Sequence, residues 1–265
     1  RVNLILRRAG LKVRFAQTDR DLGIDATAGR CRRVGVQQSR FVKARKRAQR
    51  NAQLSRIDPL AKKLVRPGVL AQARWGLSAS GAPRAQIRRL RTLSVQAAGR
   101  LRPGRDTYVQ YLLTFGEEED IVADVIGDLL CDWNRVWHMA TQAERDDTRK
   151  LWPELLRLAA DENRWSKVRG ILSALPATLR ELEWAAVSPA SWGTPSGRLL
   201  LGNPDTVDVT IRAAVKATIA TQSWKRAGAH FAGGGLEFGG DLSIARRWIE
   251  SARRKNLFDL AETAE

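Results

Sequence analysis

The chain has 265 residues, and its 46 Lys and Arg against 28 Asp and Glu give a net charge of +18. Apolar residues make up 43% of the chain and nine residues are Trp, which excludes a disordered protein. No apolar run approaches the roughly 20 residues of a membrane-spanning helix, and Cys31 and Cys131 are too far apart for a disulfide framework or a zinc knuckle. We expect a soluble intracellular protein of a reducing compartment, nuclear or cytoplasmic.

Charge is distributed unevenly along the chain. Residues 1–105 contain 27 basic and 4 acidic side chains, a net charge of +23, whereas residues 106–265 contain 19 and 24, a net charge of −5. A polyanion along the first part would relieve the repulsion and release counterions, so nucleic acid is the expected partner. An anionic membrane is not expected, because the basic helices lack the Trp, Phe and Leu face of an interfacial helix.

The first 36 residues are predicted to contain short strands. The Arg-rich opening has the composition of a transit peptide. However, residues 12–15 alternate polar and apolar side chains, and the Gly-bounded LGIDATAG follows at 22–29, which indicates strands. Because the chain opens with Arg1, we expect it to be a fragment of a longer protein.

A basic helix is predicted over residues 40–56. Small and apolar residues recur every three or four positions at Phe41, Ala44, Ala48 and Ala52, which predicts one narrow buried stripe. Cations fill most of the remaining surface, and we expect these to bind nucleic acid: Lys43, Arg45, Lys46, Arg47 and Arg50. The alternative is a solvated helix face with basic decoration.

Further helices are predicted after this segment. Asp58 is suited to cap a helix that begins at Pro59, and Pro67 with Gly68 is predicted to break it before a short helix that runs to Trp75.

The next predicted helix begins at Pro83 and stops at Gly99. Its apolar face is predicted at Ile87, Leu90, Leu93 and Ala97, and its other face carries three further candidate nucleic-acid-binding residues: Arg84, Arg88 and Arg91. Their spacing repeats that of Lys43, Arg47 and Arg50, so we expect two basic ridges that face one groove.

Residues 106–265 are predicted to form an acidic, Trp-rich helical domain with its own core. Acidic residues precede a helix whose face advances by four from Ile121 to Trp137. Thr141 and Glu144 form a capping box, and Pro153 is predicted to start another helix. Residues 184–204 are predicted to be turns around one strand at Arg198–Leu201, followed by helices. The Trp residues on helical segments are interpreted as core anchors.

No motif for catalysis or metal binding is recognised. Asp146 and Asp147 are interpreted as a solvated helix face, since two-metal chemistry needs converging carboxylates. Cys131 and His138 lie seven positions apart on one predicted helix, too far for one ion. The segment GGGLEFGG lacks the Lys and Ser/Thr of a phosphate loop. We therefore expect no cofactor in this chain.

A family resemblance is carried by the order of several segments. They are DLGIDATAG at 21–29, the basic helix, KKLVRPGVLAQARWG at 62–76, PRAQIRRLRTLSVQAAG at 83–99, ALPATLRELEW at 174–184, SPASWGTPSGRLLL at 188–201 and residues 211–249. Together they resemble the part that follows the palm in reverse transcriptases of non-long-terminal-repeat retrotransposons, in a protist-type branch. The resemblance covers residues 10–255. Trp75 and Gly76 stand where the family has a Tyr-Gly pair.

The resemblance implies a fold and a function. Residues 1–36 would end a palm-like β region, residues 37–105 would form a thumb-like helical domain that holds a template and primer duplex, and residues 106–265 would form the helical tail. The partners implied are a duplex, as an RNA–DNA hybrid, and an upstream palm domain of the same polypeptide. The Tyr/Phe-x-Asp-Asp hairpin of the palm is absent from this sequence, so magnesium is expected only in that palm.

Because the catalytic carboxylates are missing, this chain is expected not to polymerise by itself. The basic third has few aromatic residues for stacking unpaired bases, which favours tracking of a duplex backbone. Two alternatives remain open. One is a stand-alone basic helical protein that binds RNA or associates with the ribosome, and the other is an inactive retroelement relic.

Overall fold

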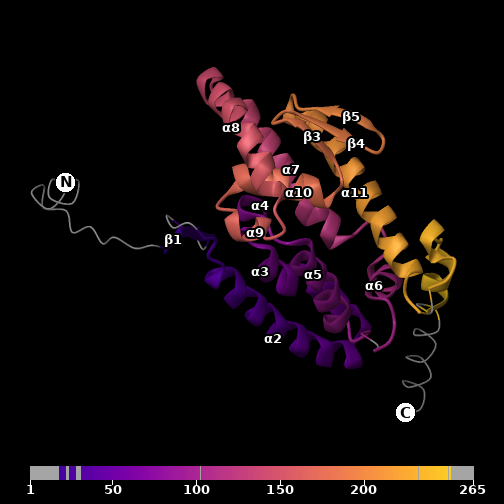
Figure 1. Ribbon diagram of the computed structural model, residues 1–265. Helices are drawn as coiled ribbons and strands as arrows, with labels where there is room; N and C mark the ends of the chain where they lie inside the picture. The colour runs from indigo at the N-terminus through magenta and orange to yellow at the C-terminus, as the bar shows by residue number, and fades with distance from the viewer. Residues whose placement is uncertain are drawn as a thin grey trace, which may run out of the picture.

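The computed structural model of this chain is mainly helical, as predicted (Figure 1). It describes residues 18–21, 24–27, 31–101, 103–231, 233–249 and 251. The predicted strand at 12–15 lies outside these residues. The elements in chain order are β1 (Thr18–Asp21), β2 (Ile24–Thr27), α2 (Gly35–Ile57), η1 (Pro59–Leu64), η2 (Val65–Leu70), α3 (Ala71–Arg74), α4 (Leu77–Ser80), α5 (Arg84–Ala97), α6 (Thr107–Phe115), α7 (Ile121–Met139), α8 (Gln142–Ala160), α9 (Arg164–Lys167), α10 (Ile171–Glu181), β3 (Ala185–Ser188), β4 (Ser191–Thr194), β5 (Gly197–Leu200), α11 (Pro204–Gly228) and η3 (Leu236–Phe238).

The N-terminal hairpin caps the basic helix. Strands β1 and β2 pair antiparallel, with Thr18 opposite Thr27, which confirms a strand in the LGIDATAG segment. The Asp25 carboxylate accepts hydrogen bonds from the backbone N–H groups of Val36 (2.9 Å) and Gln37 (3.0 Å). These N–H groups have no partner within the helix. With this cap, α2 begins at Gly35, earlier than the predicted residue 40.

The segment after α2 stays helical through Pro67 and Gly68, so the predicted break there is wrong. Asp58 caps η1 as predicted, because its carboxylate accepts the Leu60 N–H at 2.7 Å. The next turn, η2, is a π-helix, in which the Ala71 N–H donates to the Arg66 carbonyl. Pro67 is the third residue of η2. The N–H groups at the start of a helical turn have no acceptor within that turn, so the proline removes no hydrogen bond of η2.

One hydrophobic core connects the first and second parts of the chain. Helix α7 packs against α4, α5, α10 and α11, and its predicted face from Ile121 to Trp137 is buried. Leu77 and Leu90 from the basic part belong to the same buried cluster as these α7 residues. The predicted domain boundary between residues 105 and 106 therefore separates segments that share a core, and independent folding of the second part stays a prediction.

Helix α8 runs without a break past Pro153. The capping box of Thr141 and Glu144 is present as predicted, but the predicted start of a new helix at Pro153 is wrong. Pro153 lies inside α8 on an exposed position. One proline removes a single backbone hydrogen bond. The other backbone hydrogen bonds of this 19-residue helix keep it continuous. Trp152 is buried beside it, as expected for a core anchor.

A three-stranded antiparallel meander, β3-β4-β5, stands where the sequence predicted one strand and turns. Only the segment near Arg198–Leu201 was predicted as a strand, and it corresponds to β5. Trp192 on β4 is fully buried, and the meander is tied to the helices by two indole N–H groups. Trp133 donates to the Pro189 carbonyl at 2.9 Å, and Trp152 donates to the Ala186 carbonyl at 3.2 Å.

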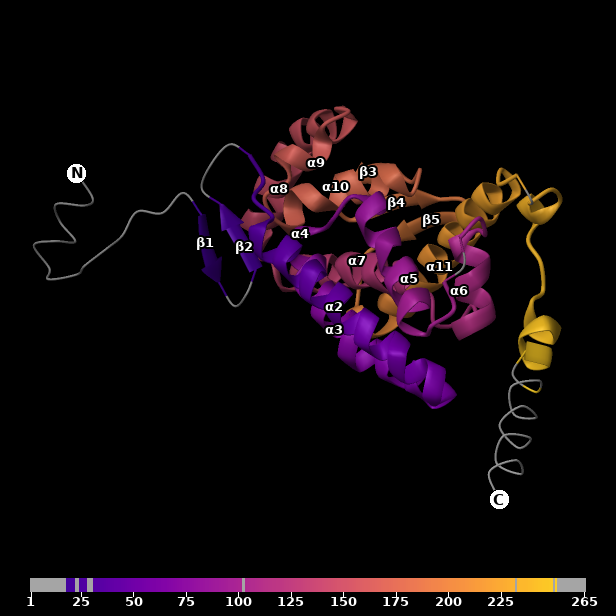
Figure 2. The ribbon, with the colours of Figure 1, turned by 90° about the horizontal axis from the view of Figure 1, so that it is seen from below.

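Helix α2 lies on the outside of the molecule. Figure 2 shows it along one edge, with the hairpin β1-β2 at its N-terminal end and α5 on its inner side. The helix α11 packs along α7 and approaches α6, as Figure 1 also shows. No helix in the described part of the chain has the length and apolar character needed to cross a membrane.

Candidate nucleic-acid interface

The predicted division of α2 into a buried stripe and a charged surface is confirmed. Ala44 and Ala48 are fully buried and pack into the common core. Phe41 and Ala52 are half-buried on the same side. The five predicted cations are all exposed: Lys43, Arg45, Lys46, Arg47 and Arg50. The small residues let α2 lie close to its neighbours, and its long cationic side chains are left in solvent.

Four of these cations share one face of the helix. Lys43, Lys46, Arg47 and Arg50 are spaced i, i+3, i+4 and i+7, so their side chains are neighbours on the helix surface. We call these four the α2 cationic face. Arg45 lies toward the opposite edge of the Ala stripe, because each helical residue advances by about 100°.

The α2 cationic face has no carboxylate partner within the described residues. Arg47 donates from Nη1 to the carbonyl of Gly68 at 3.0 Å, and the ion pairs between described residues do not involve the other three. The only acidic residue between 31 and 101 is Asp58, and its carboxylate caps η1. The positive charge of this face is therefore not neutralised by neighbouring side chains.

An exposed tryptophan lies next to α2. Trp75 is 56% exposed, and the guanidinium carbon of Arg40 lies 5.6 Å from its ring centroid. Gly76 follows with a φ of 79°, a conformation that favours glycine. The sequence analysis singled out the Trp75–Gly76 pair but not the contact of Trp75 with Arg40. The available signal was that Arg40 lies four residues before the buried Ala44, and therefore on the same side of α2.

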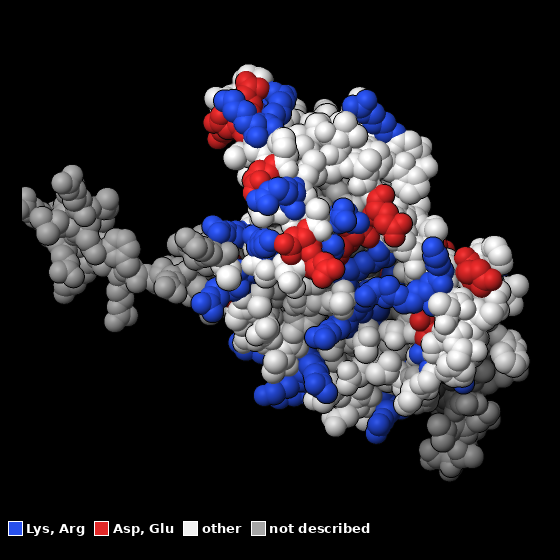
Figure 3. Space-filling model, in the orientation of Figure 1, with Lys and Arg blue, Asp and Glu red and all other residues white. Residues whose placement is uncertain are grey.

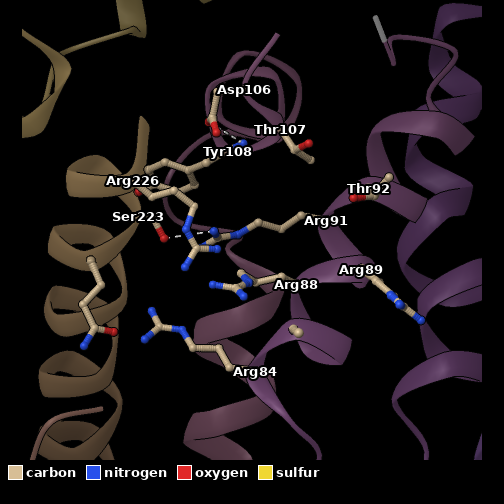
Figure 4. A pocket seen from close by; sticks show the side chains of 12 residues that line it. Arg84, Arg88, Arg89, Arg91, Thr92, Asp106, Thr107, Tyr108, Ser223 and Arg226 are labelled. Atoms are coloured by element: carbon tan, nitrogen blue, oxygen red, sulfur yellow. Dashed lines mark hydrogen bonds between the residues drawn. The ribbon is translucent and has the colours of Figure 1, made fainter. Parts of the chain in front are cut away.

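The second predicted ridge does not face α2. Arg84, Arg88 and Arg91 line a pocket of about 240 Å³ between α5, α6 and α11, and its lining includes no residue of α2. Arg226 of α11 completes the group. Figure 4 shows the guanidinium groups of Arg84, Arg88, Arg91 and Arg226 pointing toward one another. We call this the arginine pocket, and the expected common groove is corrected accordingly.

Arg91 is buried, not exposed as the sequence prediction required. Its Nε donates to Asp120 at 2.9 Å, its Nη2 donates to the other carboxylate oxygen, and its Nη1 donates to Ser223 at 2.9 Å. The guanidinium also lies 4.4 Å from the ring centroid of Tyr108. Arg91 therefore forms an internal ion pair with Asp120 and is not an exposed side chain that contacts phosphate.

The spacing contained a signal for this burial. Ile87, Leu90, Arg91 and Ser94 follow the i, i+3, i+4 and i+7 pattern of a buried helix face, and the other three are buried with Arg91. A charge at such a position implies a buried partner. The sequence did not reveal that partner, because Asp120 belongs to a helix start and Ser223 to α11.

Like charges crowd the arginine pocket. Burial, together with the neighbouring charges of Arg88 and Arg226, lowers the pKa of Arg84 to about 10. Burial, followed by Arg226, also lowers the pKa of Arg88. Glu181 acts in the opposite direction on both residues. In the space-filling view, blue side chains gather where α5 faces α11 (Figure 3). The three cations other than Arg91 therefore repel one another.

Metal ligands do not converge among the described residues. No three His, Cys, Asp or Glu side chains in this part of the chain are grouped to hold an ion. Asp146 and Asp147 lie on α8 and form i, i+3 pairs with Arg149 and Lys150, which confirms the interpretation as a solvated helix face. The expectation that magnesium belongs to an upstream palm stays a prediction.

Comparisons with known proteins give no match. No model of a protein family, no curated protein and no solved structure is significantly similar to this chain. The functional conclusion therefore depends on the geometry and charge of the α2 cationic face and of the arginine pocket.

Proposed function

We propose that this chain binds a nucleic-acid duplex by contacting its phosphates with the α2 cationic face. The observation that carries the proposal is that Lys43, Lys46, Arg47 and Arg50 are exposed on one helix face and have no carboxylate partner among the residues that the structure describes. Exposed charges of one sign at this spacing repel each other by a few tenths of a kcal/mol per pair. Phosphates opposite them remove this repulsion and release condensed counterions.

The dimensions of α2 suit a duplex backbone. Its 23 residues give a rod of about 35 Å, and Lys43 to Arg50 cover about 10 Å of it. A rod of this kind follows phosphates along a groove edge and contacts them without reading base sequence. Trp75 is the exposed aromatic residue beside α2, and one such residue is a small platform for stacking unpaired bases.

The order of sequence segments supports a more specific form of the proposal. In this form the chain is the thumb and helical tail of a retrotransposon-type reverse transcriptase, and the duplex is a template and primer hybrid. The helical architecture and the exposed basic helix agree with a duplex-holding element. Catalysis would then belong to a palm domain elsewhere in the polypeptide, and this chain would hold the duplex without polymerising.

Anisotropy of labelled oligonucleotides tests the proposal. The purified chain is titrated into an RNA–DNA hybrid, a DNA duplex, an RNA duplex and a single strand of equal length, each in several sequences and salt concentrations. We expect tighter binding to duplexes than to the single strand, little sequence preference and an affinity that falls steeply with salt. A preference for the hybrid supports the reverse-transcriptase form. Salt-independent binding, or tighter binding to the single strand, contradicts the proposal.

A further inference from the structure

We propose that the arginine pocket binds a phosphate group, either as inorganic phosphate or as a terminal phosphomonoester, separately from the α2 cationic face. The pocket draws its residues from α5, α6 and α11. These helices come together only in the folded chain. The inference does not depend on duplex binding by α2.

The first support is an imbalance of charge. Arg91 is neutralised by Asp120, but no hydrogen bond or ion pair within the described residues involves the side chain of Arg88 or Arg226. The one carboxylate among the lining residues belongs to Asp106, and it caps α6 by accepting the N–H groups of Tyr108 and Val109 at 2.8 and 3.0 Å. Within the part of the chain that the structure describes, these two guanidinium groups therefore face the pocket without a directly paired carboxylate.

Arg84 adds a third cation that is only partly compensated. Its Nη1 donates to the carbonyl oxygen of Glu181 at 3.1 Å, and its backbone N–H donates to the Glu181 carboxylate at 3.0 Å. The same carboxylate also accepts the Trp165 indole N–H at 2.7 Å. The Glu181 carboxylate is thus directed to N–H groups outside the arginine side chains, and the pocket keeps an excess of positive charge.

The second support is unused hydrogen-bonding capacity. Arg84 Nε and Tyr108 Oη are buried and have no hydrogen-bond partner among the described residues, and the Tyr108 side chain is almost wholly buried. Buried polar groups in native proteins nearly always have partners. A guanidinium N–H can only donate, and a phenol O–H can donate as well as accept, so a group with acceptor atoms can serve both.

A phosphate dianion matches both observations. It supplies several acceptor oxygens, and its two negative charges match the guanidinium groups of Arg88 and Arg226, whose planar N–H groups suit phosphate oxygens. The pocket volume of about 240 Å³ leaves room for part of the group that bears the phosphate. Arg91 lines the pocket, but its guanidinium is held in place by hydrogen bonds to Asp120 and Ser223.

Calorimetric titration of the full chain tests the proposal with two kinds of probe. The first probe is inorganic phosphate, and the second is a short single-stranded oligonucleotide prepared with a 5′-phosphate or with a 5′-hydroxyl. The variants are Arg88→Gln and Arg226→Gln, whose side chains make no hydrogen bond to another described residue. The matched control is Arg89→Gln. Arg89 is on the same helix and is itself a lining residue, but it is exposed and its guanidinium points away from the other arginines (Figure 4).

We expect Arg88→Gln and Arg226→Gln each to weaken phosphate binding about tenfold or more, the usual effect of losing a hydrogen bond between charged groups. Arg89→Gln should bind nearly as the wild type does. Binding of inorganic phosphate identifies a free anion as a ligand, and tighter binding of the 5′-phosphate than of the 5′-hydroxyl oligonucleotide identifies a chain terminus. Either result supports the pocket.

Two results overturn the proposal. One is the absence of binding of both phosphate probes to the wild-type chain, and the other is an equal loss in Arg89→Gln and Arg88→Gln, which would indicate a general effect of net charge. Replacing Lys43, Arg47 and Arg50 by Ala should leave the affinity for inorganic phosphate unchanged. This last measurement separates the pocket from the α2 cationic face, so that either proposal can fail alone.

Discussion

Arg91 of α5 and Asp120 at the start of α7 form an ion pair in which the two side chains are only 4% and 5% exposed. Every other ion pair between described residues has at least one partner that is more than a tenth exposed. The pair joins the basic part of the chain to the acidic part, and Ser223 extends the contact to α11. A charge from residues 1–105 is therefore part of the internal structure of residues 106–265.

Replacing Arg91 by Met should destabilise the protein by about 3–5 kcal/mol, because Asp120 is left as a buried charge without a partner. The measurement is the free energy of unfolding from urea denaturation followed by Trp fluorescence. The double variant Arg91→Met, Asp120→Asn should be more stable than Arg91→Met alone, since Asn keeps the cap on the Val122 N–H and removes the charge. Lys150→Ala, which breaks an exposed pair with Asp147, should cost less than about 1 kcal/mol. Equal losses in the Arg91 and Lys150 variants would contradict a structural role for the buried pair.

Replacing Lys43, Arg47 and Arg50 by Ala should weaken duplex binding without unfolding the chain. These side chains are exposed, and the one hydrogen bond lost is that of Arg47 to the Gly68 carbonyl. If each cation neutralises one phosphate, the slope of log affinity against log salt falls by about 0.9 per residue on B-form DNA. Anisotropy titrations at several salt concentrations measure this slope.

The control for that triple variant removes the same net charge elsewhere. Arg149, Lys150 and Arg157 are exposed on α8, and each forms an i, i+3 pair with a carboxylate. Their triple Ala variant should keep the wild-type salt slope. An equal effect of both triple variants would assign the binding to net charge rather than to α2.

The helices and their buried faces were largely predictable because apolar spacing is a local property. This spacing predicted the α2 stripe at Ala44 and Ala48 and the α7 face from Ile121 to Trp137. The β3-β4 pair was not, since its short strands contain Ala, Ser and Gly, and the burial of Trp192 depends on helices distant in sequence. The arginine pocket was also hidden, because Tyr108 and Arg226 reach Arg88 only through the packing of α6 and α11.

Residues 106–265 expressed alone should melt with lower cooperativity than the full chain. The α7 face that contacts α4 and α5 would be exposed, and Asp120 would lose Arg91. Near-ultraviolet circular dichroism during heating, together with binding of a hydrophobic dye, measures the effect. A sharp transition at the temperature of the full chain would instead support the predicted boundary at residues 105 and 106.

The two cysteines should differ in reactivity. Cys31 is exposed, whereas Cys131 is buried, and burial raises the pKa of its thiol to about 12. At pH 8 a disulfide reagent should label one thiol rapidly in the native protein and both thiols in urea. A rapid reaction of two thiols in the folded chain would show that α7 opens at Cys131.

The raised pKa of Cys131 also predicts that the stability of the folded chain falls as the pH becomes alkaline. The folded state favours the neutral thiol, so the contribution of this group to stability is complete below the usual thiol pKa of about 8.5. It declines as the pH rises from there toward 12. A Cys131→Ala variant should show a shallower loss of stability over this alkaline range in urea denaturation, after its constant loss of packing is subtracted.

The Asp25 cap couples the stability of the hairpin β1-β2 to the stability of α2. A ligand that stabilises α2 also stabilises the cap that Asp25 provides at the N-terminus of this helix, and the effect is reciprocal because binding free energies are linked. Amide hydrogen exchange in residues 24–27 should therefore slow when a duplex binds Lys43 and Arg47, although these residues are distant in sequence from the hairpin. A duplex bound to α2 would thus change the stability of the hairpin through a single aspartate, Asp25.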